Sequence, residues 1–351
     1  MEAVLLVGGQ GTRLRPLTLT TPKPMLPVAN HPCTAHQIAK LKSVGVTRVI
    51  LSTSYKAEVF KEYFGHGEKM GIEIEYVTET SPLGTGGAIR NVAESLRSAA
   101  DEPIIILNGD ILTGHDLRKQ IAFHQQHNAD VTLHLRTVED PRAFGLVPTD
   151  DQHRVTAFIE KPTTDAEIVT HQINAGCYIF TRRVIDEIPA DRVVSVERET
   201  FPALLRDNRN VCGYVENNYW LDLGTPLAFA QGSRDMVQGR CTTSLVSASS
   251  EALIENTAEV NPTAVVTGGS AIGADVVVGP DALVEGSVIM SGAVIHAGCT
   301  IRNSIVGVAA IINTGSRLEG AVVADLVTLA AGTNLVTGEQ VFPDGSISRS
   351  N

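Results

Sequence analysis

Residues 3–18 read AVLLVGGQGTRLRPLT and carry the first signal for the fold. The aliphatic run Ala3–Val7 leads directly into a loop with three glycines, as a buried strand leads into a turn. Glycine lets backbone N–H groups approach an anion closely, so such a loop can bind phosphate. The loop lacks the Gly-Lys-Ser/Thr of a Walker motif and the third glycine of the dinucleotide fingerprint. From these residues alone, a phosphate loop and a plain tight turn are equally open.

Further aliphatic runs follow through residues 1–235 and alternate with amphipathic stretches. Helical spacing runs from Ile38 to Val44, where Gly45 ends it, and from Gly86 to about Ala99. Strands that alternate with helices predict an α/β fold with a Rossmann-like, mostly parallel sheet covered on both faces. In such sheets, ligands bind beyond the carboxyl ends of the strands. The predicted strands are Ala3–Val7, Arg48–Ser52, Ile72–Val77, Ile104–Leu107, Val131–Leu135, Val155–Ile159 and Ile173–Phe180.

From about residue 251, aliphatic residues stand six apart, with a step of five every seventeen residues. This spacing, with small residues between, predicts a left-handed parallel β-helix of hexapeptide repeats, each forming one side of a triangular coil. A β-sandwich would show a period of two. We therefore expect a catalytic sheet domain at 1–235, a linker at 236–250 and the β-helix at 251–351. The residues in this register are Val260, Val266, Ile272, Val278, Val284, Ile289, Ile295, Ile301, Val306, Ile312, Leu318, Val323, Leu329, Leu335, Val341 and Ile347.

Composition excludes several classes of partner. The 28 basic and 39 acidic residues give a net charge of −11, which argues against nucleic acid or an anionic membrane as partner. No stretch approaches the roughly 18 apolar residues of a membrane span, and the N-terminal run is too short for a signal peptide. The five scattered cysteines lack metal-ligand spacing and are typical of thiols in a reducing compartment. We therefore expect a cytoplasmic protein.

A second motif, TPKPMLP at residues 21–27, places Lys23 between two prolines. Proline fixes φ on both sides, so this lysine should be held on a stiff segment. A lone lysine is ordinarily a solvated side chain, but a lysine held near a loop that contains Arg13 favours phosphate binding.

Together these residues resemble the sugar-1-phosphate nucleotidyltransferases, whose signature is G-G-x-G-T-R-L-R-P-L-T followed by P-K-P-x-L-P-V. That family often carries a C-terminal β-helix. The resemblance implies that a sugar 1-phosphate attacks the α-phosphorus of a nucleoside triphosphate and releases pyrophosphate. Bringing two anions together requires cations, a divalent metal and alignment. The resemblance continues in LNGD (107–110), FIEKP (158–162), INAG (173–176) and WLDLGTP (220–226).

The resemblance also implies roles for single residues. Arg13 and Lys23 are expected to act on the triphosphate and Lys161 on the sugar phosphate, as the catalytic cations. The expected cofactor is Mg²⁺, held by Asp110 and Asp222. From the residues alone, an Asx turn at Asp110 and a helix N-terminal acid at Asp222 fit better. The expected nucleotide-binding residues are Leu6, Gly8, Gly9, Gly11, Thr12, Arg13, Lys23, Glu79, Gly84, Thr85 and Asp110. The expected sugar-phosphate-binding residues are Gly109, Gly145, Glu160, Lys161 and Asn174.

Residues 79–87, ETSPLGTGG, are expected to lie over the nucleobase. Thymidylyl and uridylyl members usually have a glutamine before the Pro-x-Gly segment, where this chain has Glu79. A carboxylate can accept hydrogen bonds from the N1–H and amino groups of guanine, which thymine and uracil cannot both donate. The segment also resembles that of guanylyltransferases that make GDP-mannose, although Val7 and Gly86 replace the alanines common there. We expect GTP and mannose 1-phosphate as substrates, with dTTP and glucose 1-phosphate as the second choice.

Two other classes of function stay open. A β-helix often belongs to an acyltransferase, but such enzymes generally need a histidine base, and His296 is the one histidine after residue 251. A non-catalytic paralogue that senses sugar nucleotides would have lost some of the charged residues that this chain keeps. We expect the β-helix to make a homo-oligomer. Glu197 is a further sugar-site candidate, although a surface helix of mixed charge is the better interpretation of its segment.

Overall fold

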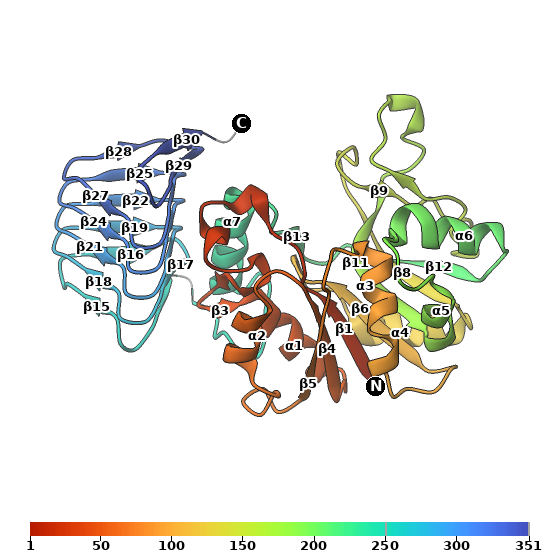
Figure 1. Cartoon of the computed structure of the whole chain (residues 1–351). Helices are drawn as coiled ribbons and strands as arrows, with labels where there is room; N and C mark the ends of the chain where they lie inside the picture. The colour runs from red at the N-terminus through yellow and green to blue at the C-terminus, as the bar shows by residue number, and fades with distance from the viewer. Residues whose placement is uncertain (250, 350–351) are drawn as a thin grey trace. The chain divides into compact units, whose positions relative to one another are not determined.

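The computed structural model describes residues 1–249 and 251–349 (Figure 1). The chain forms two compact units: unit 1 comprises Met1–Gly9 and Ile38–Trp220, and unit 2 comprises Gln10–Gln37 and Leu221–Asn351. The segment after the first glycines therefore groups with the C-terminal part of the chain. The division into 1–235, 236–250 and 251–351 stays a prediction. Ser250, the end of the predicted linker, and residues 350–351 of the predicted β-helix lie outside the described residues.

Unit 1 is built on a nine-stranded sheet. Strands β5, β4, β1 and β6 are parallel, as predicted, and β11 then continues the sheet antiparallel to β6. The sheet is therefore mixed beyond β6, where β8 and β9 also pair with β11 and β12 pairs with β8. The strands are β1 (Glu2–Leu6), β4 (Arg48–Thr53), β5 (Glu73–Thr78), β6 (Pro103–Asn108), β8 (Val131–Thr137), β9 (Gly145–Leu146), β10 (Ile159–Glu160), β11 (Gln172–Thr181) and β12 (Val211–Val215).

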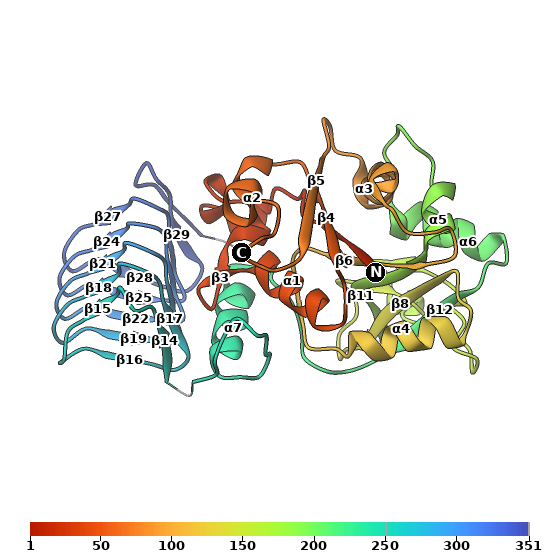
Figure 2. The ribbon, with the colours of Figure 1, turned by 90° about the horizontal axis from the view of Figure 1, so that it is seen from below.

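Helices cover both faces of this sheet, as Figure 2 shows. On one face, α3 (Gly84–Asn91), α5 (Arg182–Glu187) and α6 (Phe201–Arg206) bury aliphatic and aromatic side chains against the strands. On the other face, α4 (Leu117–Gln126) packs on β8, β11 and β12. Helix α2 (Ala57–Phe64) also belongs to unit 1, whereas α1 (Cys33–Ser43) begins in unit 2 and ends in unit 1.

Two local predictions for this region need correction. The helix predicted from Gly86 to Ala99 begins at Gly84 and ends at Asn91, where a short 3-10 turn follows. The strand predicted at Val155–Ile159 is wrong except at its last residue, which begins β10. Val155 is buried but forms only an isolated bridge, to Thr149. The preceding Arg154 bridges Cys212 of β12 instead, so the two residues do not extend one ladder. A period-two pattern is too weak over five residues to distinguish these cases.

Unit 2 contains the predicted left-handed parallel β-helix, whose stacked coils are visible in Figure 2. Three sheets form its faces. The first sheet contains β14 (Ala252–Ile254), β17 (Ser270–Ile272), β20 (Val288–Ile289), β23 (Ile305–Val306), β26 (Val322–Val323), β29 (Glu339–Val341) and β30 (Ile347–Arg349). The second contains β15 (Glu259–Val260), β18 (Val277–Val278), β21 (Val294–Ile295), β24 (Ile311–Ile312) and β27 (Thr328–Leu329). The third contains β16 (Val265–Thr267), β19 (Leu283–Glu285), β22 (Thr300–Arg302), β25 (Arg317–Glu319) and β28 (Asn334–Leu335).

The pairing register of these strands confirms the predicted aliphatic register. Val260 pairs with Val278, for example, and Ile272 pairs with Ile289. From Ile272 to Val341 every residue of the register is buried in the interior of the β-helix. Ile347 is the exception: it lies in β30, which turns back antiparallel to β29, and its side chain is 56% exposed. The period therefore ends with Val341.

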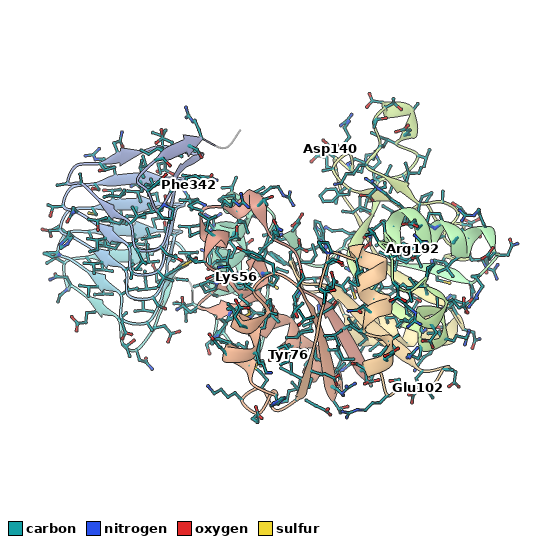
Figure 3. All side chains as sticks on the ribbon, viewed as in Figure 1. Lys56, Tyr76, Glu102, Asp140, Arg192 and Phe342 are labelled. Carbon is teal, nitrogen blue, oxygen red and sulfur yellow. The ribbon has the colours of Figure 1, made fainter. Side chains whose placement is uncertain are left out.

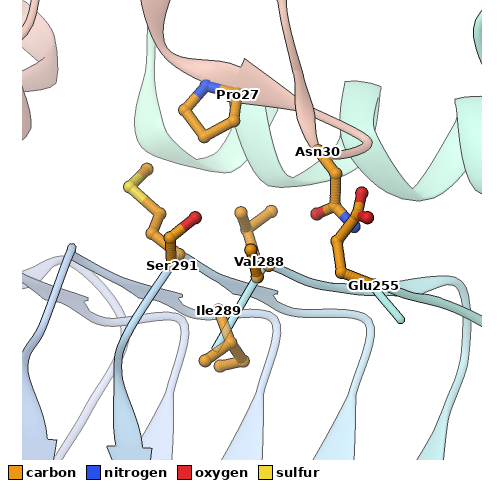
Figure 4. A pocket seen from close by; sticks show the side chains of 9 residues that line it. Pro27, Asn30, Glu255, Val288, Ile289 and Ser291 are labelled. Carbon is orange, nitrogen blue, oxygen red and sulfur yellow. The ribbon is translucent and has the colours of Figure 1, made fainter. Parts of the chain in front are cut away.

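The N-terminal part of unit 2 packs on an outer face of the β-helix. The outward residues Ala271, Val288, Ile305 and Val322 of the first sheet are buried. They lie on the side where α7 (Pro226–Val237) and the hairpin of β2 (Pro27–Val28) and β3 (His31–Pro32) pack. The amide Nδ2 of Asn30 in this hairpin donates to the carbonyl oxygen of Ile272 at 2.9 Å. Figure 4 shows the seam, which contains a partly open pocket of about 80 Å³. The segment 10–37 therefore folds as part of the β-helix unit.

No helix in the described residues has the length and apolar character that a membrane crossing requires.

Candidate active site

The carboxyl ends of β1 and β6 meet at one edge of the sheet in unit 1. The two strands pair in parallel, and the N–H of Gly109 donates to the carbonyl oxygen of Leu6 at 2.9 Å. Gly8 and Gly9 follow β1, while Asp110 follows Gly109 in the turn before β7 (Ile111–Thr113). The structure thus brings five sequence-predicted residues to the same edge, as the rule for parallel sheets requires. They are Leu6, Gly8, Gly9, Gly109 and Asp110.

Lys23, Arg13 and Asp222 form a charged cluster in unit 2. Lys23 opens the 3-10 turn η3 (Lys23–Met25), and its side chain is only 8% exposed. Its Nζ lies 3.5 Å from Oδ1 of Asp222, whereas Nη2 of the more exposed Arg13 lies 4.0 Å from Oδ2 of the same carboxylate. The prediction that Lys23 is held rather than solvated is therefore confirmed.

Gly11 makes the close packing around Lys23 possible. Its φ is +60°, in the left-handed region that favours glycine. A Cβ at this position would lie 2.7 Å from the Cβ of Lys23, so any side chain would displace the lysine. Thr12 follows at the start of the 3-10 turn η1 (Thr12–Leu14) and is exposed. Gly11 and Lys23 are thus packed directly against each other.

The predicted sugar-binding residues lie on neighbouring strands of unit 1. Glu160 of β10 pairs with Gly145 of β9, and β9 in turn pairs with β11, which carries Asn174. The amide Nδ2 of Asn174 donates to the hydroxyl of Tyr178 at 2.8 Å, and its Oδ1 accepts from the N–H of Gly176 at 3.2 Å. These bonds orient the asparagine. Burial raises the pKa of the Glu160 carboxyl, and the negative charge of Glu197 raises it further.

Lys161 follows Glu160 with an unusual backbone. Its φ is +50°, and its N–H donates to the carbonyl oxygen of Phe144 at 3.2 Å. A non-glycine residue in this region costs on the order of 1–3 kcal/mol and persists where the surroundings require it. The side chain itself is exposed. The backbone bond to Phe144 fixes the main chain of Lys161 directly after β10.

The segment that contains Glu197 forms the short π-helix η6 (Val196–Thr200), in agreement with the helix expected from the sequence. A surface helix of mixed charge describes the exposed Arg198, but Glu197 is only partly exposed. Its Oε2 accepts hydrogen bonds from Oγ1 of Thr85 at 2.7 Å and from Oγ of Ser195 at 2.9 Å. Glu197 is the neighbouring carboxylate whose charge raises the pKa of Glu160. Glu197 therefore lies within electrostatic reach of Glu160, a proximity between distant segments that no local spacing indicates.

Glu79 is the first residue of the loop that was expected to lie over the nucleobase, and its side chain bonds within that loop. It follows β5, and its Oε2 accepts from the N–H of Leu83 at 3.2 Å. Burial raises the pKa of the Glu79 carboxyl. Helix α3 begins directly after this loop, at Gly84.

Sequence reasoning missed an aromatic pair near Asn174. The rings of Phe144 and Trp220 meet edge to face with centroids 5.6 Å apart, and Nε1 of Trp220 donates to the carbonyl oxygen of Ala175 at 2.9 Å. Trp220 is the single tryptophan of the chain and stands at the head of the WLDLGTP segment. Its position at the head of that motif was the sequence signal that could have identified Trp220 as a site residue.

No group of three or more His, Cys, Asp or Glu side chains that could hold a metal ion occurs among residues 1–249 and 251–349. His296, the residue that an acyltransferase would need, is exposed on the β-helix.

The chain matches known proteins over most of its length. The nucleotidyl transferase family model matches residues 2–239, and the model of the GMPPB C-terminal domain matches residues 248–351. A mannose-1-phosphate guanylyltransferase of Mycobacterium tuberculosis is 47% identical over 334 residues, which cover 95% of this chain and 82% of the relative. A probable mannose-1-phosphate guanylyltransferase 2 of Oryza sativa subsp. japonica is 34% identical over 358 residues, covering 99% and 95%.

A solved structure is also similar. HddC from Yersinia pseudotuberculosis, crystallised in complex with GMP-PN, is 27% identical with a TM-score of 0.55, covering 67% of this chain and 98% of that one. The chain therefore belongs to the nucleotidyl transferase family and is related to its mannose-1-phosphate guanylyltransferases.

Proposed function

We propose that this chain transfers the guanylyl group of GTP to mannose 1-phosphate and releases pyrophosphate. The observation that carries the proposal is the nearly buried Lys23, whose ammonium group lies beside the carboxylate of Asp222. Relatives that cover most of the chain are mannose-1-phosphate guanylyltransferases, and a similar structure binds GMP-PN, which supports this choice of substrates.

In this reaction a phosphate oxygen of mannose 1-phosphate attacks the α-phosphorus of GTP. The bond from that phosphorus to the oxygen shared with the β-phosphate breaks, and pyrophosphate leaves. Arg13 and Lys23 neutralise charge on the triphosphate, the backbone N–H groups of the glycine loop bind its oxygens, and Lys161 holds the sugar phosphate. No covalent intermediate is needed, because alignment and charge neutralisation supply the catalysis.

Asp110 and Asp222 are proposed as ligands of Mg²⁺. In phosphoryl-transfer sites, Mg²⁺ is held by one or two carboxylates together with substrate phosphates and waters, rather than by a cage of protein ligands. The donor set fits this pattern, since the carboxylate of Asp222 is 30% exposed and Asp110 stands in a turn at a sheet edge. The bound ion would withdraw charge from the phosphates.

Recognition of the two substrates is assigned to three carboxylates and one amide. Glu79, oriented by its bond to Leu83, is proposed to accept hydrogen bonds from the N1–H and amino groups of guanine. Glu160, Glu197 and Asn174 are proposed to bind sugar hydroxyls.

A substrate panel tests the proposal. Pyrophosphate release is measured with Mg²⁺ for GTP, ATP, UTP and dTTP, each against mannose, glucose and N-acetylglucosamine 1-phosphates. We expect kcat/KM for GTP with mannose 1-phosphate to exceed other pairs by about 10²-fold or more, because a wrong base leaves buried polar groups unpaired. A preference for dTTP would contradict the guanine assignment, and no turnover with any pair would contradict enzymatic function.

We further propose that the chain forms a homo-oligomer through the β-helix and resides in the cytoplasm, where its buried cysteines would stay reduced. The outward residues Val277, Val294 and Ile311 of β18, β21 and β24 stack into an apolar ladder, and Val277 is 38% exposed. Light scattering should give a multiple of 37.4 kDa, and Val294→Glu should reduce it to the monomer mass. A monomer at all concentrations of the unaltered protein would refute the assembly.

A further inference from the structure

The hydroxyl of Thr85 lies where two segments of unit 1 meet, residues 83–86 and residues 194–198. Thr85 stands in the first turn of α3, directly after the loop that is proposed to bind the nucleobase. Its Oγ1 donates to Oε2 of Glu197 at 2.7 Å and accepts from the N–H of Val196 at 2.9 Å. A hydroxyl has one hydrogen to donate, and Glu197 accepts it here, so Oγ1 of Thr85 does not also donate to a phosphate or a base of the nucleotide.

Glu197 is held by a second hydroxyl as well. Oγ of Ser195 donates to the same oxygen, Oε2, at 2.9 Å, and it also accepts from the N–H of Arg198 at 3.1 Å. Two hydroxyls on one carboxylate oxygen fix the orientation of the side chain and leave the other oxygen, Oε1, able to accept hydrogen bonds from a ligand.

The backbone joins the same two segments. Val194 donates its N–H to the carbonyl oxygen of Leu83 at 2.8 Å, and its own carbonyl oxygen accepts from the N–H of Gly86 at 2.8 Å. Gly84 has a φ of +72°, and a Cβ there would lie 2.6 Å from that carbonyl oxygen. Residues 194–198 approach α3 just after Arg192, which Figure 3 labels. The two segments therefore form one packed unit, and a shift in either one moves the other.

Glu197 also acts on the residues assigned to the sugar. Its charge, together with burial, raises the pKa of Glu160, so the two carboxylates lie within electrostatic reach of each other. Glu160 in turn pairs with Gly145 across β9 and β10. The hydroxyl of Thr85 thus connects the nucleobase loop to the group of carboxylates.

We propose that Thr85 is a positioning residue for the sugar, not a ligand of the nucleotide: its hydroxyl aims the Glu197 carboxylate at the hydroxyls of the sugar 1-phosphate. Selectivity for the sugar then depends on a residue of the nucleobase loop. This inference rests on the proposed function, and it replaces the sequence-based expectation that Thr85 binds nucleotide.

The test is a steady-state comparison of Thr85→Val, which keeps the shape and removes the hydroxyl, with Thr85→Ser, which keeps the hydroxyl. Thr85→Val should raise the KM for mannose 1-phosphate by about tenfold or more, because a hydrogen bond to a charged group is lost. The KM for GTP should change less than about threefold, and Thr85→Ser should resemble the unaltered enzyme. Thr47→Val, at an exposed threonine directly before β4 and outside that loop, is the matched control and should change neither constant.

A double-mutant cycle adds a second readout. Glu197→Gln should raise the KM for mannose 1-phosphate, and adding Thr85→Val to it should cause little further increase, since both act through one carboxylate. Ser195→Ala should produce a smaller rise of the same kind. This variant tests the inference even if Thr85→Val does not fold, which thermal unfolding will show.

Several results would overturn the inference. One is a rise in the KM for GTP as large as that for the sugar phosphate in Thr85→Val. A second is additive effects in the double variant, and a third is an unchanged sugar KM in both Thr85→Val and Ser195→Ala. The substrate panel on the unaltered enzyme separates failure of the proposed function from failure of this inference. If the panel identifies another substrate pair, the same variants are measured with that pair. The inference then predicts a higher KM for the sugar phosphate of that pair and not for its nucleotide.

Discussion

Replacing Lys23 with methionine is expected to lower kcat/KM by about 10²- to 10³-fold, the cost of removing one fixed group that stabilises transition-state charge. The side chain is 8% exposed and its Nζ lies 3.5 Å from Asp222, so solvent cations cannot easily replace its charge. Methionine preserves much of the apolar stem, and Asp222 is exposed enough to be hydrated without its partner. The fold should therefore be retained, as thermal unfolding will show beside the rate of pyrophosphate release.

Two further variants sharpen this result. Lys23→Arg should restore little activity, because the planar guanidinium is larger and Gly11 packs closely against the lysine. Lys69→Met removes an exposed lysine and should leave the rate unchanged. A folded Lys23→Met enzyme within threefold of normal kcat/KM would show that this cation does not act on the phosphates.

Asp110→Asn is expected to lower kcat by about 10²-fold or more, with no recovery in excess Mg²⁺. Asparagine keeps the size of the side chain, and the bond from Gly109 to Leu6 that holds the turn uses only the backbone. What is lost is the negative charge, and Mg²⁺ prefers charged oxygen ligands. The measurement is pyrophosphate release across a Mg²⁺ titration.

The control for this prediction is Asp101→Asn, which changes an exposed carboxylate at the start of the turn before β6 and should have no effect. If Asp110→Asn turns over normally at saturating Mg²⁺, Asp110 is not a metal ligand, and the simple Asx-turn interpretation of this residue is correct.

The β-helix could be predicted almost residue by residue, because its determinant is local. Each coil repeats the same spacing, so Ile272, Ile289 and Val306 fall in one ladder without reference to the rest of the chain. The end of the period could not be predicted, since Ile347 keeps the spacing while the chain turns back at Gly345, where φ is +80°. The turn overrides the repeat.

The candidate site was predictable where a general rule applies. The rule for parallel strands placed Asp110 at the sheet edge, and the flanking prolines indicated that Lys23 is held. The bond from Thr85 to Glu197 was not predictable, because it joins residues that are 112 positions apart and of common types. Such contacts depend on the packing of α3 against the segment before α6, which no local pattern records.

The seam between the hairpin at Asn30 and the coils of the β-helix has a consequence for how this chain can vary. Extra coils added at the far end would leave the seam untouched, whereas deleting the coil that carries Ile272 would remove the surface on which Asn30 rests. Lys23 lies a few residues before this hairpin. Lineages that lengthen the C-terminal module should therefore tolerate the change, while those that trim its first turns would perturb the lysine segment as well.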